Sequence, residues 1–334
     1  MKTKLIYLAA TLLIIACGQD EQKKEQPVTP QKPTVIKEPN VEKPAFNADS
    51  AYAYVKAQVD FGPRFPNNEA HGKCAKYLES KLKSFGMNAF TQIGKATTFN
   101  KKEITIKNII GEYNPKANKR ILLFAHWDSR PFADQDTKNM TKPILGANDG
   151  ASGVGVLLEV ARQLSISKPE IGVDIIFFDA EDYGQPSGIS DDEYSSNTWC
   201  LGSQYWANNL HQPGYKPEFG ILLDMVGGSN PQFMHEAFSN KYAPQVVQKV
   251  WANANKLGYG NYFLNSQTGY LIDDHKFVNE IAGIPSIDII HYENHRGSFH
   301  PTWHTHHDNM DIIDKNSLAA VGQVLLYTIK QESK

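Results

Sequence analysis

Short apolar runs and amphipathic helical patterns alternate along most of the chain. Five apolar runs are typical of strands, and four of them are nearly continuous, as in strands that are buried on both faces. The runs lie at 102–113, 120–125, 173–178, 219–226 and 285–291. Apolar residues at helical spacing predict helices elsewhere. These helices are expected at 50–59, 69–85, around 154–161, and at 201–209, 243–257, 273–281 and 318–329.

This alternation predicts an α/β fold with a mixed, mostly parallel central sheet and helices on both of its faces. Binding sites in such sheets form beyond the carboxyl ends of the strands. Residues 45–334 contain neither a second linker nor an internal repeat, so we expect them to form a single domain.

The first 44 residues have a different character. Lys2 and Lys4 precede an apolar run that is short for a transmembrane helix, so residues 1–16 are predicted to be an export signal. The run ends in a small residue and Cys17, which is the pattern of a bacterial lipoprotein with a lipidated cysteine. An ordinary cleaved signal is the alternative. Residues 17–44 are rich in Pro, Glu, Lys and Gln and predict a disordered tether.

These features predict an exported protein that is anchored to a membrane through its lipid, on the periplasmic face or at the cell surface, with the outer membrane favoured. The charge is nearly balanced, with 34 basic and 36 acidic side chains, and it indicates no nucleic-acid partner. Cys74 and Cys200 either form a disulfide, which an oxidising compartment permits, or remain buried thiols. The sequence leaves this open because it does not give the distance between them.

Acidic and histidine residues follow the expected buried strands. Because the carboxyl ends of parallel strands lie at one edge of a sheet, we expect these residues to converge. The set consists of His126, Asp128, Asp179, Glu181, Asp182 and Asp224 at strand ends, Asp149 in a small-residue turn, and His304 in a late loop. Each also has a structural explanation when it is considered alone; Asp149, for example, would cap the helix that begins near Ser152.

So many carboxylates cannot all stay ionised in a partly dry cleft unless a cation is present or their pKa values rise. Carboxylate and imidazole groups together suit Zn²⁺. The sequence therefore predicts a zinc site at this edge, with the number of ions left open.

The same residues resemble the motifs of the M28 family of zinc aminopeptidases, in order, from about Ala45 to the C-terminus. Within that family the chain is most similar to the glutaminyl cyclases. This similarity is carried by the segments 177–182 (FFDAED), 222–227 (LLDMVG), 273–275 (DDH) and 303–305 (WHT). The last two segments distinguish cyclases from peptidases best.

The resemblance implies a zinc aminopeptidase-like fold, with 45–334 as the catalytic domain and one Zn²⁺ per chain. The implied zinc ligands are Asp149, Asp182 and His304. Glu181 is the implied general base and acid, and Asp224 and Asp273 join it in a hydrogen-bonded acidic group. The residues implied to line the substrate pocket are Trp303 and Phe299, and those implied to stand behind the ligands are His126 and Asp128.

The sequence departs from the animal cyclases in three places. Those enzymes carry two glutamates where this chain has Glu181 and Asp182, and they carry a histidine near the acidic group where this chain has Asp288. The aromatic residue that follows their two acids is missing here. We expect the insertion at 183–198 to bring Trp199 to the same wall of the pocket.

The implied reaction converts the N-terminal glutamine of exported peptides and proteins to pyroglutamate and releases ammonia. Zinc would polarise the γ-amide, and Glu181 would move the proton. The main alternative is a two-zinc aminopeptidase of the same fold, in which His126 and Asp224 would also bind metal and Glu181 would activate water. A binding lipoprotein without catalysis is a further alternative, and it leaves Glu181 unexplained.

Overall fold

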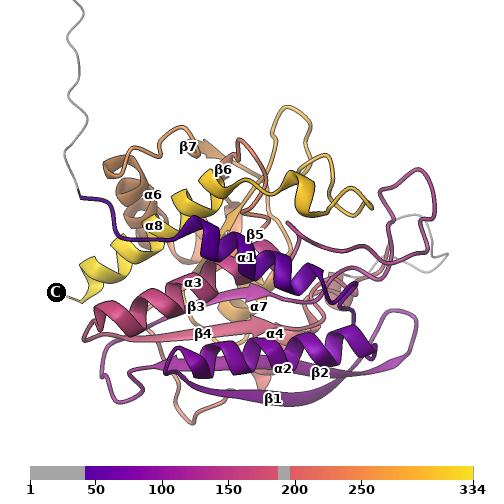
Figure 1. Cartoon of the computed structure of the whole chain (residues 1–334), viewed down its shortest axis with the longest axis horizontal. Helices are drawn as coiled ribbons and strands as arrows, with labels where there is room; N and C mark the ends of the chain where they lie inside the picture. The colour runs from indigo at the N-terminus through magenta and orange to yellow at the C-terminus, as the bar shows by residue number, and fades with distance from the viewer. Residues whose placement is uncertain (1–41, 187–195, 334) are drawn as a thin grey trace, which may run out of the picture. The chain divides into compact units, whose positions relative to one another are not determined.

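The nearly continuous apolar runs form neighbouring strands of a six-stranded sheet in this computed structural model, with the strand order β1-β2-β4-β3-β5-β8 (Figure 1). Four strands are parallel and fully buried: β3 (Arg120–His126), β4 (Gly172–Phe178), β5 (Gly220–Asp224) and β8 (Ser286–Ile290). The antiparallel pair β1 (Asn88–Thr97) and β2 (Glu103–Tyr113) extends the sheet beyond β4. A short parallel pair, β6 (Phe233–His235) and β7 (Phe263–Gln267), lies apart from it.

The structure describes residues 42–186 and 196–333. The predicted signal 1–16, the predicted lipidation site Cys17 and nearly all of the predicted tether 17–44 lie outside these residues, as does most of the insertion at 183–198. Within the described ranges, no helix has both the length and the apolar character that a membrane crossing requires.

Helices cover both faces of the sheet. The helices are α1 (Ala48–Val59), α2 (Glu69–Ser84), α3 (Ala151–Ser167), α4 (Leu201–Asn208), α5 (Ala237–Tyr242), α6 (Pro244–Lys256), α7 (Asp274–Glu280) and α8 (Lys315–Glu332). In Figure 1, α1, α2, α3 and α8 lie in front of the sheet, whereas α4 and α7 lie behind it. Two short 3₁₀ turns, η1 (Ser196–Thr198) and η2 (Met310–Ile312), complete the described elements.

Side chains of β3 alternate between two hydrophobic cores. Ile121, Leu123 and Ala125 belong to the larger core, which contains residues of α1, α2, α3, α6 and α8. Leu122 and Phe124 belong to a second core with residues of α4 and α7. Because both faces are covered, the interior positions of the strand are apolar, and this explains the continuous run at 121–125. The predicted α/β fold is confirmed.

The predicted strands and helices are all present, with bounds that differ by a few residues. The run at 219–226 ends earlier than expected, at Asp224, because Met225 turns into the left-handed region with φ of 48°. The sequence analysis missed β1, β6, β7 and α5. In β1, only Ala89 and Gly94 are buried, so the strand lacks the clear alternation of a half-buried strand.

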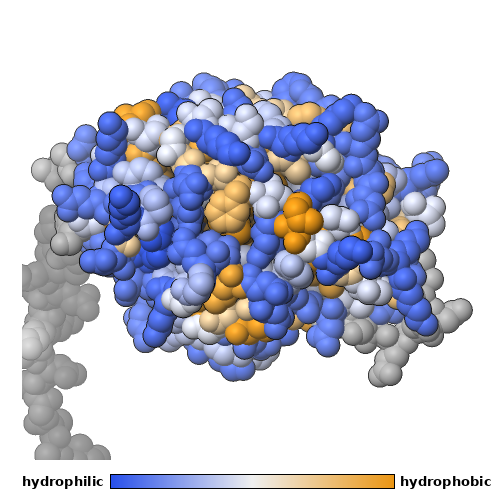
Figure 2. All heavy atoms as spheres, turned by 90° about the horizontal axis from the view of Figure 1, so that it is seen from below, coloured by the Kyte–Doolittle hydropathy of each residue, from blue (hydrophilic) through white to orange (hydrophobic). Residues whose placement is uncertain are grey.

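The β1 side of the molecule is mostly hydrophilic, with apolar side chains scattered in small groups (Figure 2). Ile93 of β1 is 58% exposed, and its strand neighbours Gln92 and Lys95 are polar. Polar side chains on an edge strand discourage pairing with a second sheet edge. This edge of the sheet is therefore protected against pairing with another sheet.

Candidate active site

The ends of three parallel strands bring the predicted site residues together. His126 is the last residue of β3 and Asp224 is the last residue of β5, and their Nε2 and Oδ1 atoms are 3.1 Å apart. Glu181 and Asp182 follow β4, which pairs in parallel with β3 so that Phe178 lies opposite His126. The expected convergence at one edge of the sheet is confirmed for these residues, whereas the carboxylate of Asp179 pairs with His71 Nε2 at 2.9 Å instead.

Asp149 reaches the same place from the turn that precedes α3. It is not a helix cap, because the residue at the cap position of α3 is Gly150 and no side chain caps the helix there. Gly150 has φ of 91°, and a Cβ atom there would lie 2.5 Å from the backbone oxygen of Asp128. Only glycine lets the turn approach the end of β3 this closely.

Asp149, Asp182 and His304 form a candidate metal site, since one ligand atom from each lies within 4.8 Å of the others. The Nε2 atom of His304 is 3.1 Å from Asp182 Oδ1 and 3.7 Å from Asp149 Oδ2. All three side chains are buried, and the Oδ2 atoms of both aspartates lack a hydrogen-bond partner among the described residues. Buried carboxylate oxygens without partners are costly unless a cation is present, so this set fits Zn²⁺.

A second candidate set shares Asp149. It consists of His126, Asp149 and Asp224, and His126 Nε2 is 3.0 Å from Asp149 Oδ1. The resemblance implied that His126 stands behind the ligands, but the structure places it directly beside Asp149. The reason is that β3 carries His126 to the very end of the strand, at the level of the carboxylates. The geometry of this edge therefore offers positions for one or two metal ions.

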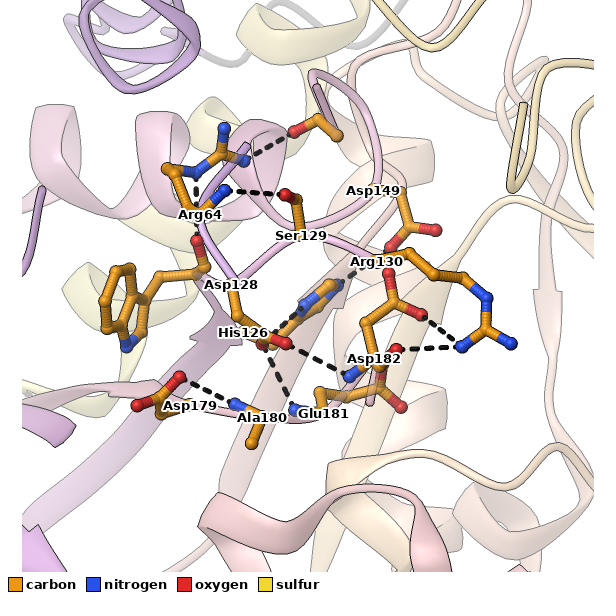
Figure 3. Close-up of polar contacts among 12 residues, drawn as sticks. Arg64, His126, Asp128, Ser129, Arg130, Asp149, Asp179, Ala180, Glu181 and Asp182 are labelled. Atoms are coloured by element: carbon orange, nitrogen blue, oxygen red, sulfur yellow. Dashed lines mark hydrogen bonds and ion pairs between the residues drawn. The ribbon is translucent and has the colours of Figure 1, made fainter. Parts of the chain in front are cut away.

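Asp128 holds the loop after β4. Its carboxylate accepts hydrogen bonds from the backbone N–H groups of Glu181 and Asp182, at 3.1 and 3.3 Å, and lies 3.4 Å from His126 Nδ1 (Figure 3). Asp128 thus contacts the backbone of the acid pair and belongs to neither candidate metal set. It fixes the position of the acid pair relative to His126.

Two residues that the sequence analysis missed support His304. Asp134 Oδ1 is 3.1 Å from His304 Nδ1, and Arg130 donates hydrogen bonds to both oxygens of Asp134 at 2.5 and 2.9 Å. Burial alone would raise the pKa of Asp134, but His304 and Arg130 hold it well below its usual value. Arg130 also donates to the backbone oxygen of Asp182 at 2.8 Å (Figure 3). A carboxylate behind a histidine ligand fixes the orientation of the ring.

The turn that carries Asp149 is held from two sides. Asp308 accepts hydrogen bonds from the backbone N–H groups of Asn148 and Asp149, at 2.7 and 3.0 Å. Arg64 is fully buried and donates to the backbone oxygens of Trp127 and Gly146, among others, at 3.1 and 2.8 Å (Figure 3). No periodic pattern indicates these contacts, because they join segments that lie far apart in the chain.

Asp273 lies within 4.8 Å of Glu181, but no hydrogen bond joins Asp224 or Asp273 to Glu181 among the described residues, so the predicted acidic group is not a hydrogen-bonded one. Glu181 is only 8% exposed, and burial raises its pKa well above the usual value, against the lowering effect of His126. Burial and neighbouring carboxylates also raise the pKa values of Asp273 and Asp288 well above normal. Asp288 lies behind the group, with one oxygen 3.8 Å from His275 Nδ1. Burial and nearby like charges disfavour the ionised form of a carboxyl group.

The backbone is strained at several positions around the site. Ala180, Cys200, Met225 and His304 all have φ between 48° and 56° although none is glycine. Each such position costs about 1–3 kcal/mol and persists only where surrounding contacts impose it. Ala180 precedes Glu181, Cys200 contacts Glu181, and Met225 follows Asp224. His304 belongs to the candidate metal site.

Aromatic rings line one side of the candidate metal site. The ring of Trp303 stacks on His304 with centroids 3.8 Å apart, and Phe299 packs against Trp303 at 4.8 Å. Trp199 is nearly parallel to His304 at 5.9 Å, and the Arg130 guanidinium lies 4.6 Å from its ring. All three aromatic residues predicted to line the pocket therefore lie together, including Trp199 after the insertion.

The two cysteines do not pair in the structure. Cys74 in α2 and Cys200 before α4 are buried, free thiols. The thiol of Cys200 instead donates a hydrogen bond to Glu181 Oε1 at 3.1 Å.

The order and geometry of these residues can be compared with known proteins. The model of peptidase family M28 matches residues 108–329, a span that includes all the acids of the site and His304. The chain belongs to this family. The solved structure of a zinc-dependent exopeptidase from Parabacteroides distasonis is similar to this chain at 50% identity, with a TM-score of 0.84, over 86% of this chain and 99% of that one.

Within family M28 the chain is similar to glutaminyl cyclases. The solved structure of the glutaminyl cyclase of Bacteroides thetaiotaomicron, bound to N-acetylhistamine, matches with a TM-score of 0.84 and 52% identity, over 86% of this chain and 99% of that one. Among curated proteins, the glutaminyl-peptide cyclotransferase of Bothrops jararaca is 26% identical over 66% of this chain. The match covers 64% of that snake enzyme's length.

Proposed function

We propose that this M28 family member is a zinc-dependent glutaminyl cyclase, which converts an N-terminal glutamine to pyroglutamate and releases ammonia. The observation that carries the proposal is the pairing of Glu181, a buried acid with a raised pKa, with the adjacent Asp182 of the candidate metal site. Its similarity to a bacterial glutaminyl cyclase over 99% of that chain supports the same activity.

In this proposal, Asp149, Asp182 and His304 hold one zinc ion per chain. When bound there, zinc supplies Lewis acidity to a carbonyl oxygen of the substrate. Glu181 accepts a proton from the α-amine of the glutamine as that nitrogen attacks the γ-carboxamide carbon. It then gives a proton to the departing ammonia.

The remaining residues orient the substrate and control its protons. Trp303, Phe299 and Trp199 form the apolar wall against which the glutamine side chain folds back toward its own amine. Because the nucleophile and the leaving group belong to one residue, this folding supplies much of the rate enhancement. Asp273 lies within 4.8 Å of Glu181 and favours its protonated form, and Asp224 acts on Asp273 in the same way.

A two-zinc aminopeptidase is the second candidate function. It is favoured by one observation, the second potential ligand set of His126, Asp149 and Asp224. The aromatic rings beside His304 and the similarity to a bacterial glutaminyl cyclase over 99% of that chain favour the cyclase.

Ammonia release and metal content, measured on one sample, test the proposal. The purified protein is incubated with a dipeptide that begins with glutamine, and released ammonia and released free amino acid are followed together. Ammonia without free amino acid, at about one zinc per chain, is expected. Free amino acid at two zinc ions per chain would establish the peptidase instead.

We further propose that the protein is exported and anchored through a lipid on Cys17, with the outer membrane as its location and exported chains that begin with glutamine as its substrates. The sequence pattern that ends at Cys17 supports this location. A Cys17→Ala variant is expected to leave the membrane fraction, whereas unchanged sedimentation with membranes would oppose the lipid anchor.

A further inference from the structure

The general acid–base proposed above has an unusual partner. The Cys200 thiol donates a hydrogen bond to Glu181 Oε1 at 3.1 Å, and both side chains are buried. Across residues 42–186 and 196–333, this is the one side-chain hydrogen bond that the Glu181 carboxylate makes. The orientation of the carboxylate therefore depends on a sulfur atom from the segment that begins α4.

Cys200 is itself fixed relative to the loop that it contacts. Its backbone N–H donates to the backbone oxygen of Glu181 at 2.9 Å, and the N–H of Leu201 donates to the backbone oxygen of Ala180 at 3.0 Å. Cys200 has φ of 56°, a conformation that is strained for a residue with a side chain. Two backbone bonds and one side-chain bond thus join the same pair of segments, and the strained backbone of Cys200 is part of this junction.

The start of α4 is also tightly packed against the loop that follows β4. A Cβ atom on Gly202 would lie 2.1 Å from the backbone oxygen of Asp179. Asp179 is held in turn by His71, whose Nε2 is 2.9 Å from both of its carboxylate oxygens. The thiol therefore approaches Glu181 from a rigid support.

We propose that Cys200 is a positioning residue, which holds Oε1 of Glu181 and leaves the other oxygen directed at the substrate. The inference rests on the proposed function, because it assigns Cys200 a role only through Glu181. A thiol is a weak donor, so it orients a carboxylate while withdrawing little of its basicity. Burial keeps the pKa of Cys200 well above its usual value, which leaves the sulfur protonated and able to donate.

Substitutions at both buried cysteines test this role. Cys200→Ala removes the donor, and Cys200→Ser retains one in nearly the same place. Cys74→Ala is the matched control, since Cys74 is also a fully buried free thiol but lies in α2 and makes no contact with Glu181. The kinetics of ammonia release from a glutamine-initiated peptide, the zinc content and the Tm are measured for each variant.

Cys200→Ala is expected to lower kcat about 10- to 100-fold with KM and zinc content nearly unchanged, since a small misplacement of a catalytic group has effects of this size. Cys200→Ser should recover most of kcat, and Cys74→Ala should lower Tm without lowering kcat. A wild-type kcat in Cys200→Ala would overturn the inference. So would a fall in kcat that is accompanied by an equal loss of zinc, or that Cys74→Ala shows to the same extent. These results would leave the proposed function standing. Wild-type protein that releases no ammonia would overturn the proposed function and this inference with it.

Discussion

Replacing Asp134 by asparagine should weaken zinc binding although Asp134 is not a proposed ligand. Its carboxylate lies 3.1 Å from His304 Nδ1 and is held by two hydrogen bonds from Arg130. The His304 side chain is 2% exposed, so water cannot replace the lost carboxylate. Partners of this kind change metal affinity 10- to 100-fold, or about 1.4–2.8 kcal/mol.

The substitution has a second effect on the same site. Asparagine leaves the buried guanidinium of Arg130 without its charged partner, and the next carboxylate oxygen is Asp182 Oδ1 at 3.7 Å. The Arg130 guanidinium is then attracted to the carboxylate of Asp182, a proposed zinc ligand, and competes with the metal for the oxygen atoms of that carboxylate. We therefore expect the upper part of this range in Asp134→Asn.

Asp136→Asn is the matched control, since Asp136 also pairs with a histidine but at the surface. Its Oδ2 atom is 2.8 Å from Nδ1 of His306, which is 37% exposed and belongs to no candidate metal site among the described residues. Zinc dissociation constants are measured by competition with a chromogenic chelator. An Asp134→Asn affinity within twofold of the Asp136→Asn affinity would refute the reasoning.

Three other changes have defined outcomes. Glu181→Gln should lower ammonia release about 10²- to 10⁴-fold while zinc content stays at the wild-type level; full activity would remove Glu181 from the mechanism. Burial alone would raise the pKa of Glu236, but hydrogen bonds from His275 and backbone N–H groups lower it to about 2. Because the pKa of Glu236 is lower in the folded than in the unfolded state, its contribution to the free energy of unfolding is complete above about pH 5 and is lost as the pH falls toward about 2. In urea unfolding, the free energy of unfolding of Glu236→Gln should therefore fall less steeply with acid than that of the wild type. Leu123→Ala should cost about 2–5 kcal/mol in urea unfolding, since Leu123 is fully buried in the larger core, and a cost under about 1 kcal/mol would contradict that packing.

The sequence predicted those parts of the molecule that local pattern determines. The run is apolar from 121 to 125 because β3 contacts a core on each face, and His126 is the last residue of this strand, at the edge where the site forms. Asp149 was identifiable because a small-residue turn precedes a helix at the same edge. Strand β1 was missed because an edge strand with few buried residues leaves no periodic signal.

The supporting residues could not be predicted in the same way. Asp134 contacts His304 across 170 positions of sequence, and Asp308 contacts the turn at Asp149 across about 160. Such contacts depend on how long loops fold over the sheet, which apolar periodicity does not encode. The position of His126 beside Asp149 also depended on the close approach of the turn at Gly150 to the end of β3.

The mass of a glutamine-initiated peptide after incubation tests the central claim most directly. The peptide is treated with the purified zinc-loaded protein, and a peptide that differs only by an N-terminal alanine is treated in parallel. The account predicts that the glutamine peptide loses the mass of one ammonia and keeps every residue, while the alanine peptide is unchanged. Loss of the whole first residue from either peptide would contradict it and identify an aminopeptidase.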